Sequence, residues 1–177
     1  MFTNPPSPSY LKRQFSQVSA VGIMGTARTL PADAVKPELA PVFDVIKSYR
    51  APVYLYKVCS TFDSSARVGN IGKAIELGLE IFSPEFVPVL AAAPKLGRHT
   101  VFGNHFAAVG DGEIFRLDRH PSISKHPVTP MQEADLRRHL AQQTELRSGL
   151  INILNINAGP EKINSQIDKF ISAGVSI

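Results

Sequence analysis

Polar side chains that could bind a small anion are concentrated in residues 57–63, Lys-Val-Cys-Ser-Thr-Phe-Asp, and in the Gly-Asn-Ile-Gly sequence at 69–72. This segment follows a predicted strand and precedes a predicted helix, which is where α/β sheets place their ligands. A helix start offers N–H groups to an anion, and Lys, Ser and Thr add a charge and hydroxyl donors. The candidate binding residues here are Lys57, Ser60, Thr61, Gly69 and Asn70. The same residue types also cap helices and form turns, so a purely structural role stays open.

Two arginines follow other predicted strands and should reach the same edge of the sheet. Arg28 comes shortly after an apolar run that ends at Met24, and Arg98 lies in the loop 93–99 that follows another run. An arginine can donate two parallel hydrogen bonds to a carboxylate. A solvated loop arginine is the common alternative, but three basic loops on one edge favour an acidic ligand.

Other reactive residue types form no recognisable catalytic or metal-binding pattern. The sequence has no phosphate-binding Walker loop, dinucleotide-binding fingerprint or nucleophile elbow. Its five histidines lack the spacing of metal ligands, and His105 and His120 are interpreted either as ligand contacts or as loop residues. The single cysteine, Cys59, has no nearby base, so we expect a packed thiol rather than a nucleophile.

The composition indicates one compact α/β domain. The 177 residues are 44% hydrophobic and 19% charged, and a single cysteine excludes an internal disulfide. No apolar run approaches the roughly 20 residues of a membrane-spanning helix, and the first residues lack the features of a signal peptide. We therefore expect a cytoplasmic protein with no membrane association. The net charge of +4 is scattered along the chain, so nucleic-acid binding is not supported.

The hydrophobic pattern predicts a three-layer α/β domain with a mainly parallel sheet and a small antiparallel hairpin insert. Residues 1–18 are expected to form an extended arm, and residues 19–177 the domain. The predicted parallel strands are Val18–Met24, Pro52–Val58, Phe86–Ala92 and Gly149–Leu154. The predicted helices are residues 35–49, kinked or split by Pro37 and Pro41; a helix starting near Asn70; Thr129–Gln143; and a helix on Ile163–Ile171, ended by Gly174. The predicted hairpin is residues 100–117, turning at Gly110-Asp111-Gly112.

Several of these segments, in this order and spacing, resemble the amino-terminal, sugar-acid-binding domain of the four-carbon acid sugar kinases. The resemblance covers residues 19–177 and rests on the segments Tyr56–Thr61 with Gly69–Gly72, Ala93–Arg98, His126–Met131 and Gln143-Thr144. This family phosphorylates tetronates such as threonate or erythronate with ATP. The resemblance implies that Lys57, Ser60, Thr61, Asn70 and Arg98 contact the sugar acid, with Gly69, Gly97 and Arg28 beside them.

The chain departs from the family pattern at the loop and at both ends. Members commonly have Lys-x-Asp-Ser-Thr-x-Arg leading directly into Gly-Asn-Ile-Gly, whereas Cys59 stands here at the Asp, Asp63 at the Arg, and residues 64–68 are extra. This difference implies a divergent substrate subgroup. The family's opening strand with Asp-Asp-x-Thr-Gly and its nucleotide-binding domain have no counterpart, and Val175–Ile177 would only begin a strand.

The resemblance therefore implies that this chain is the substrate-binding part of an ATP-dependent kinase for threonate- or erythronate-type acids. The full-length family uses ATP and Mg²⁺, and this chain alone is expected to bind neither and to be inactive. Expected partners are the sugar acid, the missing kinase domain or another chain, and a second copy in a homo-oligomer. The alternative is a non-catalytic module that binds sugar acids or another protein.

Overall fold

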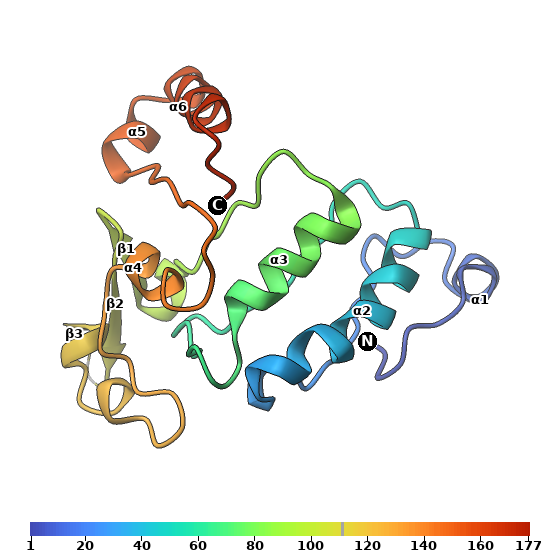
Figure 1. Cartoon of the computed structure of the whole chain (residues 1–177), viewed down its shortest axis with the longest axis horizontal. Helices are drawn as coiled ribbons and strands as arrows, with labels where there is room; N and C mark the ends of the chain where they lie inside the picture. Colours follow the sequence, from blue (N-terminus) through green and yellow to red (C-terminus); the bar gives the residue numbers. More distant parts are fainter. Residues whose placement is uncertain (111) are drawn as a thin grey trace.

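The computed structural model describes residues 1–110 and 112–177 (Figure 1). Within them lie an antiparallel sheet of three strands and six α-helices, joined by short 3₁₀ turns. The helices are α1 (Pro8–Gln14), α2 (Ala32–Ser48), α3 (Ile71–Phe82), α4 (Leu136–Leu140), α5 (Ile153–Asn157) and α6 (Pro160–Ser172). The strands are β1 (Arg98–Val101), β2 (Asn104–Val109) and β3 (Glu113–Arg116). The 3₁₀ turns are η1 (Ala27–Thr29), η2 (Pro94–Leu96), η3 (Leu117–Arg119) and η4 (Ile123–Lys125).

The predicted hairpin is confirmed as β2 and β3, which pair antiparallel with Val109 opposite Glu113. Gly110 and Gly112 on either side of the turn have positive φ angles of 47° and 99°, a conformation that glycine adopts without steric cost. Asp111, at the predicted tip, lies outside the described residues. The insert is larger than expected because β1 adds to the other edge of β2, with Arg98 opposite Ala107.

Helices α2 and α3 lie side by side and share one core (Figure 1). Val35, Leu39 and Phe43 recur every four residues along α2 and are buried against Ala74 and Leu77 of α3. This packing explains why α2 runs unbroken through Pro37 and Pro41, where the sequence predicted a kink or a split. Each proline removes one helical hydrogen bond, but the buried stripe holds both halves on the same partner.

A second core lies between α3, the antiparallel sheet and α4. Phe62, Leu117 and Ala107 are completely buried there, and Ile71 and Ile75 of α3 pack against them. Phe62 belongs to the loop that carries the candidate binding residues. The core therefore anchors this loop through its central side chain.

No parallel sheet forms among the described residues, although four segments have the sequences of its strands. The backbone of residues 52–57 makes no backbone hydrogen bond within the described chain. Its side chains nevertheless alternate as in a strand: Val53 and Leu55 are 77% and 84% exposed, whereas the rings of Tyr54 and Tyr56 pack on Phe82 and Phe43, respectively. Residues 52–57 thus have one face on the helices and one bare face.

The predicted helix at Thr129–Gln143 is wrong for its first half, since α4 covers only Leu136–Leu140. The hydroxyl of Thr129 contacts the ring nitrogen Nδ1 of His126 at 3.0 Å instead of capping a helix. Farther along, the carbonyl of Ala134 accepts from the backbone N–H of His105, which ties the chain to the edge of β2. Asp135 then caps α4 by accepting from the N–H of Arg137.

Two further segments differ from the sequence-based expectation. The predicted strand Gly149–Leu154 turns into α5, because Asn152 and Asn155 form a reciprocal capping box around the helix start. The expected arm contains the short helix α1, which Ser7 caps and Pro8 begins. The amphipathic helices α3 and α6, in contrast, lie where the sequence predicts them.

Candidate functional site

The site loop, defined as residues 57–70, passes beside the segment that carries Arg28. The backbone N–H of Gly69 donates to the carbonyl of Leu30 at 2.9 Å, and that of Ala32 donates to the carbonyl of Arg67 at 2.8 Å. Val68 and Pro31 form an antiparallel bridge between these two bonds. Two loops that the sequence placed on one edge of a sheet therefore do lie side by side.

A continuous chain of polar side chains runs across this loop and reaches Arg28. The hydroxyl of Thr61 donates to one carboxylate oxygen of Asp63 at 2.7 Å, and the other oxygen forms an ion pair with the guanidinium of Arg28. This hydroxyl has one proton, which it donates to Asp63, so it can only accept from Cys59. The thiol of Cys59 therefore donates to Thr61 across 3.0 Å. Asp63 is only 9% exposed in its side chain, while Arg28 is 60% exposed and accessible to a ligand.

The start of α3 does not offer the free N–H groups that the sequence suggested. The side-chain oxygen of Gln143 accepts from the N–H groups of Ile71 and Gly72 at 2.8 and 3.4 Å. The side chain of Asn70 accepts from the N–H of Lys73 at 2.8 Å. In this structure Asn70 is the helix cap, and the anion-attracting end of α3 is neutralised by the protein itself.

The glycines around this helix start make room for the protein's own backbone. A Cβ on Gly69 would lie 2.4 Å from the carbonyl oxygen of Arg28, and a Cβ on Gly72 would lie 2.7 Å from that of Gln143. Gly69 also has a positive φ of 62°. These contacts supply a structural reason for both glycines, one of which, Gly69, is a candidate binding residue.

Two buried histidines contact the site loop from the interior. The ring nitrogen Nε2 of His105 lies 2.8 Å from the carbonyl oxygen of Ser60, and Nε2 of His139 lies 3.0 Å from the hydroxyl of Ser64. Burial lowers the pKa of both rings, and the charges of Arg98 and His99 lower the pKa of His105 further. The histidines are therefore neutral at pH 7.

Lys57 and Arg98 lie differently in relation to the loop. Lys57 is exposed and makes no hydrogen bond or ion pair within residues 1–110 and 112–177. Arg98 donates through Nη1 to the carbonyls of Leu96, Gly97 and Ala108, so its guanidinium braces its own hairpin. The sequence suggested instead that Arg98, like Arg28, reaches the edge where the site loop lies. Gly97, with φ of 64°, forms the tight turn before β1.

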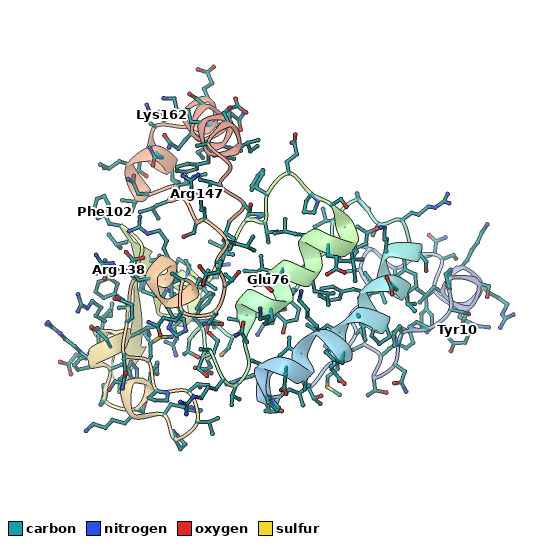
Figure 2. The ribbon with its side chains drawn as sticks, viewed as in Figure 1. Tyr10, Glu76, Phe102, Arg138, Arg147 and Lys162 are labelled. Carbon is teal, nitrogen blue, oxygen red and sulfur yellow. The ribbon has the colours of Figure 1, made fainter. Side chains whose placement is uncertain are left out.

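An ion-pair cluster links α3, the helix that follows the site loop, to α2 and to the segment after α4. Glu76 lies on α3 near the middle of the molecule (Figure 2), where it accepts from Thr144 and Lys73 at 2.8 and 2.9 Å and faces Lys36 of α2. Burial alone would raise the pKa of Glu76, but these hydrogen bonds and positive charges together lower it below its ordinary value. The cluster fixes α3 rather than offering a binding site.

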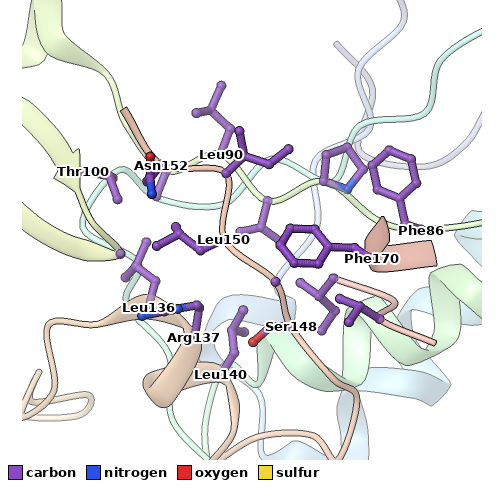
Figure 3. Close-up of a pocket in the computed structure, with 18 of the residues that line it drawn as sticks. Phe86, Leu90, Thr100, Leu136, Arg137, Leu140, Ser148, Leu150, Asn152 and Phe170 are labelled. Atoms are coloured by element: carbon purple, nitrogen blue, oxygen red, sulfur yellow. The ribbon is translucent and has the colours of Figure 1, made fainter. Parts of the chain in front are cut away.

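A separate cavity of about 260 Å³ lies between α4, α6 and the segments 86–92 and 148–153 (Figure 3). Its lining is mainly aliphatic and aromatic, with Leu90, Leu150 and Phe170 prominent. The charged side chain in the lining, Arg137, is held by two hydrogen bonds to Asp135. A sugar acid needs several polar partners, so this cavity suits it less than the site loop does.

The described residues contain neither a metal-ion cluster nor a membrane-spanning helix. No group of three histidine, cysteine or acidic side chains in them is arranged to hold a metal ion. No helix in the same residues combines the length and apolar character needed to cross a bilayer.

The buried residues that hold the site loop in place have no local signal in the sequence pattern. Ser64, Gln143 and His139 are each at least 95% buried and share one hydrogen-bond network. The pair Gln143-Thr144 carried part of the family resemblance, but its role as the helix cap of α3 had no local signal. A contact across 72 residues, such as Gln143 to Ile71, depends on the tertiary fold.

Comparison with known proteins assigns the chain to a family. Residues 7–177 match the family model described as "Sugar-binding N-terminal domain". The chain belongs to this family. The match confirms the resemblance to an amino-terminal, sugar-binding domain and includes the site loop, the hairpin and α6.

Relatives of this sugar-binding domain are named as kinases. The chain is 48% identical over 151 residues to a protein from Paraburkholderia graminis named 3-oxo-isoapionate kinase, covering 85% of this chain and 32% of the relative. It is 36% identical over 159 residues to a 3-oxo-tetronate kinase from Pseudomonas savastanoi pv. phaseolicola, covering 89% and 35%. The chain thus spans about a third of the length of these curated relatives.

A solved structure supports the fold. A Haemophilus influenzae protein has a TM-score of 0.80 to this chain with 26% sequence identity, over 91% of this chain and 37% of that one. The overall fold of this chain therefore matches that of about a third of the solved protein.

Proposed function

We propose that this chain is the sugar-acid-binding part of an ATP-dependent kinase for 3-oxo-tetronate- or 3-oxo-isoapionate-type acids. The observation that carries the proposal is the site loop, which displays hydroxyl groups beside accessible cations in a domain of a sugar-binding family. The kinase names of the relatives supply the substrate class. Cys59 and Asp63, which depart from the common family pattern, then mark a divergent substrate subgroup.

Each exposed residue of the loop has a role in this proposal. The ammonium of Lys57 and the outer face of the Arg28 guanidinium neutralise the carboxylate of the acid. The hydroxyl of Ser60 donates to a hydroxyl or keto oxygen of the acid, whereas Thr61, whose one proton goes to Asp63, accepts from a hydroxyl group of the acid. Phosphoryl transfer depends mainly on positioning, so the domain contributes by orienting the acceptor hydroxyl. In the proposal, the backbone around the binding residues is supported by Asn70, Gly69, Gly97 and Arg98.

ATP and Mg²⁺ do not fit the described residues. A magnesium site needs convergent oxygen ligands, and no acidic cluster is present in residues 1–110 and 112–177. The N–H groups at the start of α3, which could cradle a phosphate, are already paired. In the proposal the nucleotide binds elsewhere, in a kinase domain or in another chain that joins this one.

The proposal also completes the fold. Residues 19–177 are the partial domain, and the extended segments 52–57 and 86–92 become strands of a mainly parallel sheet in a three-layer α/β architecture once partner strands join them. The bare face at Val53 and Leu55 also favours the alternative function, a non-catalytic module that binds a sugar acid or another protein, including a second copy.

Calorimetry with the purified chain tests the function. We expect 3-oxo-tetronate to bind and raise the melting temperature, and citrate, a matched polycarboxylate, to do neither. ATP alone should give no heat and no turnover with any tetronate. If no four-carbon acid binds, the sugar-acid role is contradicted. If the chain then still associates with a kinase fragment, the alternative function, a module that binds another protein, is favoured.

A further inference from the structure

The proposed binding residues Ser60 and Thr61 belong to a tight turn that contacts the interior at both ends. In the site turn, residues 60–64, Thr61 is half-buried, Asp63 is 9% exposed in its side chain and Phe62 is completely buried between them. Phe62 adopts a positive φ of 57°, a costly conformation for an aromatic residue. Such a conformation persists only when the surroundings hold it in place.

The first end of the turn is held by His105. This ring is fully buried, and its Nε2 lies 2.8 Å from the carbonyl oxygen of Ser60. A carbonyl only accepts, so Nε2 carries the proton and donates. In the neutral ring Nδ1 is then an acceptor, and the hydroxyl of Thr100 donates to it at 2.7 Å. The chain Thr100, His105 and Ser60 links β1 and β2 to the turn.

The second end is held by His139 in the same tautomer. The hydroxyl of Ser64 donates its one proton to the carbonyl of Phe62 at 2.9 Å. The Ser64 oxygen therefore accepts from Nε2–H of His139 at 3.0 Å and from the amide of Gln143 at 2.9 Å. The His139 ring also packs edge-on against Phe62, with ring centres 5.9 Å apart.

We infer that His105 and His139 are positioning residues that clamp the two ends of the site turn and thereby hold Thr61, together with the Asp63–Arg28 ion pair, in place for the ligand. The ligand in this inference is the one of the proposed function. The clamp is specific to these two rings: His120 is also buried, at 4% exposure, but its Nδ1 accepts from the N–H of Ile123 within its own loop. His120 is thus a matched control that lacks contact with the turn.

Protonation of either ring should destabilise the folded turn through the burial of charge, although Nε2–H still donates and these hydrogen bonds favour the charged form. Burial lowers the pKa of both, and Arg98 and His99 near His105 add to this effect, whereas Glu133 near His139 acts in the opposite direction. The hydroxyl of Thr100 could turn and accept from a protonated His105. The cost of protonation is therefore mainly the burial of a positive charge beside Arg98.

Cys59 gives a readout of the turn that needs no ligand. It is the single cysteine of the chain, it immediately precedes the turn, and its thiol donates to Thr61 within the turn. We expect iodoacetamide at fixed pH to modify Cys59 about five- to tenfold faster in His105→Leu and His139→Leu than in the parent. His105→Gln, whose amide N–H replaces Nε2–H, should stay within about twofold, and His120→Leu should do the same despite a lower melting temperature.

Affinity measurements complete the test. The Leu variants should bind 3-oxo-tetronate about five- to tenfold more weakly, the loss expected for one neutral hydrogen bond, while His105→Gln and His120→Leu bind as the parent does. If the parent binds no acid, the proposed function fails, and the alkylation rates still decide the clamp. Equal rates in the Leu variants and His120→Leu would overturn it.

The parent chain, without any substitution, allows a test that does not depend on whether a variant folds. Nitrogen-15 NMR of the imidazole rings at pH 7.5 should show Nε2–H with unprotonated Nδ1 for both His105 and His139. The opposite tautomer, or an imidazolium at this pH, would overturn the clamp irrespective of any variant.

Discussion

The backbone of Gly69 lies against the carbonyl of Arg28 so closely that a Cβ at residue 69 would come within 2.4 Å of that oxygen. The contact joins η1 to the start of α3. It lies beside the ion pair between the exposed guanidinium of Arg28 and Asp63. The geometry of the candidate site is therefore built into the chain.

Replacing Gly69 by Ala should destabilise the fold by about 2–4 kcal/mol, because the new Cβ meets rigid backbone and φ is 62°. Urea unfolding measures the change. Gly78→Ala is the control: it lies within α3 with open space around its Cα, so it should stabilise by about 0.5–1 kcal/mol. Equal stability of the two variants would contradict the packing described for Gly69.

Gln143 and its neighbour Gln142 should respond very differently to alanine. Gln143 is 4% exposed and serves Ile71, Gly72 and Ser64, so Gln143→Ala leaves several buried groups unpaired and should cost about 2–4 kcal/mol. Gln142 is exposed, so its alanine variant should change stability by less than about 0.5 kcal/mol. Chemical denaturation of both variants at pH 7 compares them directly.

Lys57→Met should weaken sugar-acid binding by about 1.5–3 kcal/mol, the usual worth of a hydrogen bond to a charged group. The melting temperature should barely change, because Lys57 is exposed and unpaired within the described residues. Lys162→Met on α6, another exposed lysine (Figure 2), controls for the loss of one surface charge. If both variants bind as tightly as the parent in calorimetry, Lys57 is not a ligand residue.

Stability should fall as the pH drops from 7 toward 5. Burial lowers the pKa of His105, His120 and His139, so the folded chain binds fewer protons than the unfolded chain in this range. Their contribution is complete above the ordinary histidine value of 6.5 and is lost as the pH falls through the lowered folded values. Urea midpoints at several pH values test this.

The carboxylates act in a lower pH window. Hydrogen bonds from Arg116 and Arg137 lower the pKa of Asp118 and Asp135, respectively, so their contribution is lost only below the ordinary carboxyl value of about 4. A stability curve that stays flat between pH 7 and 5 would therefore contradict the neutral histidines, whatever happens in stronger acid.

Local signals predicted the parts of the fold that local interactions determine. The Asn70 cap with the apolar face of α3 marks a helix whatever surrounds it, and Gly174 ends α6 in the same way. Thr129 had an equally good capping pattern, but His126 bonds its hydroxyl and Ala134 binds β2, so tertiary contacts prevailed. Strand segments such as 52–57 need partners that the pattern cannot supply.

The sequence predicted candidate residues for the site, but it did not predict the residues that support the loop. Thr61, Lys57 and Arg28 follow from the position of polar residues after apolar runs, and Arg28 does reach the loop through Asp63. The histidine contacts span 45 and 75 residues, and neither His105 nor His139 lies in a motif. Only the folded chain shows which buried ring meets which part of the loop.

The alternation along residues 53–57 couples two properties of the molecule. Val53, Leu55 and Lys57 are two residues apart and exposed, so they share the bare side of the segment, and Lys57 leads into the site loop. Any layer that covers Val53 and Leu55 also strips water from around the Lys57 ammonium. The local dielectric falls, and the attraction between this charge and a carboxylate strengthens. Assembly and ligand affinity are thus thermodynamically linked, and the uncovered chain represents the weak-binding limit of the site.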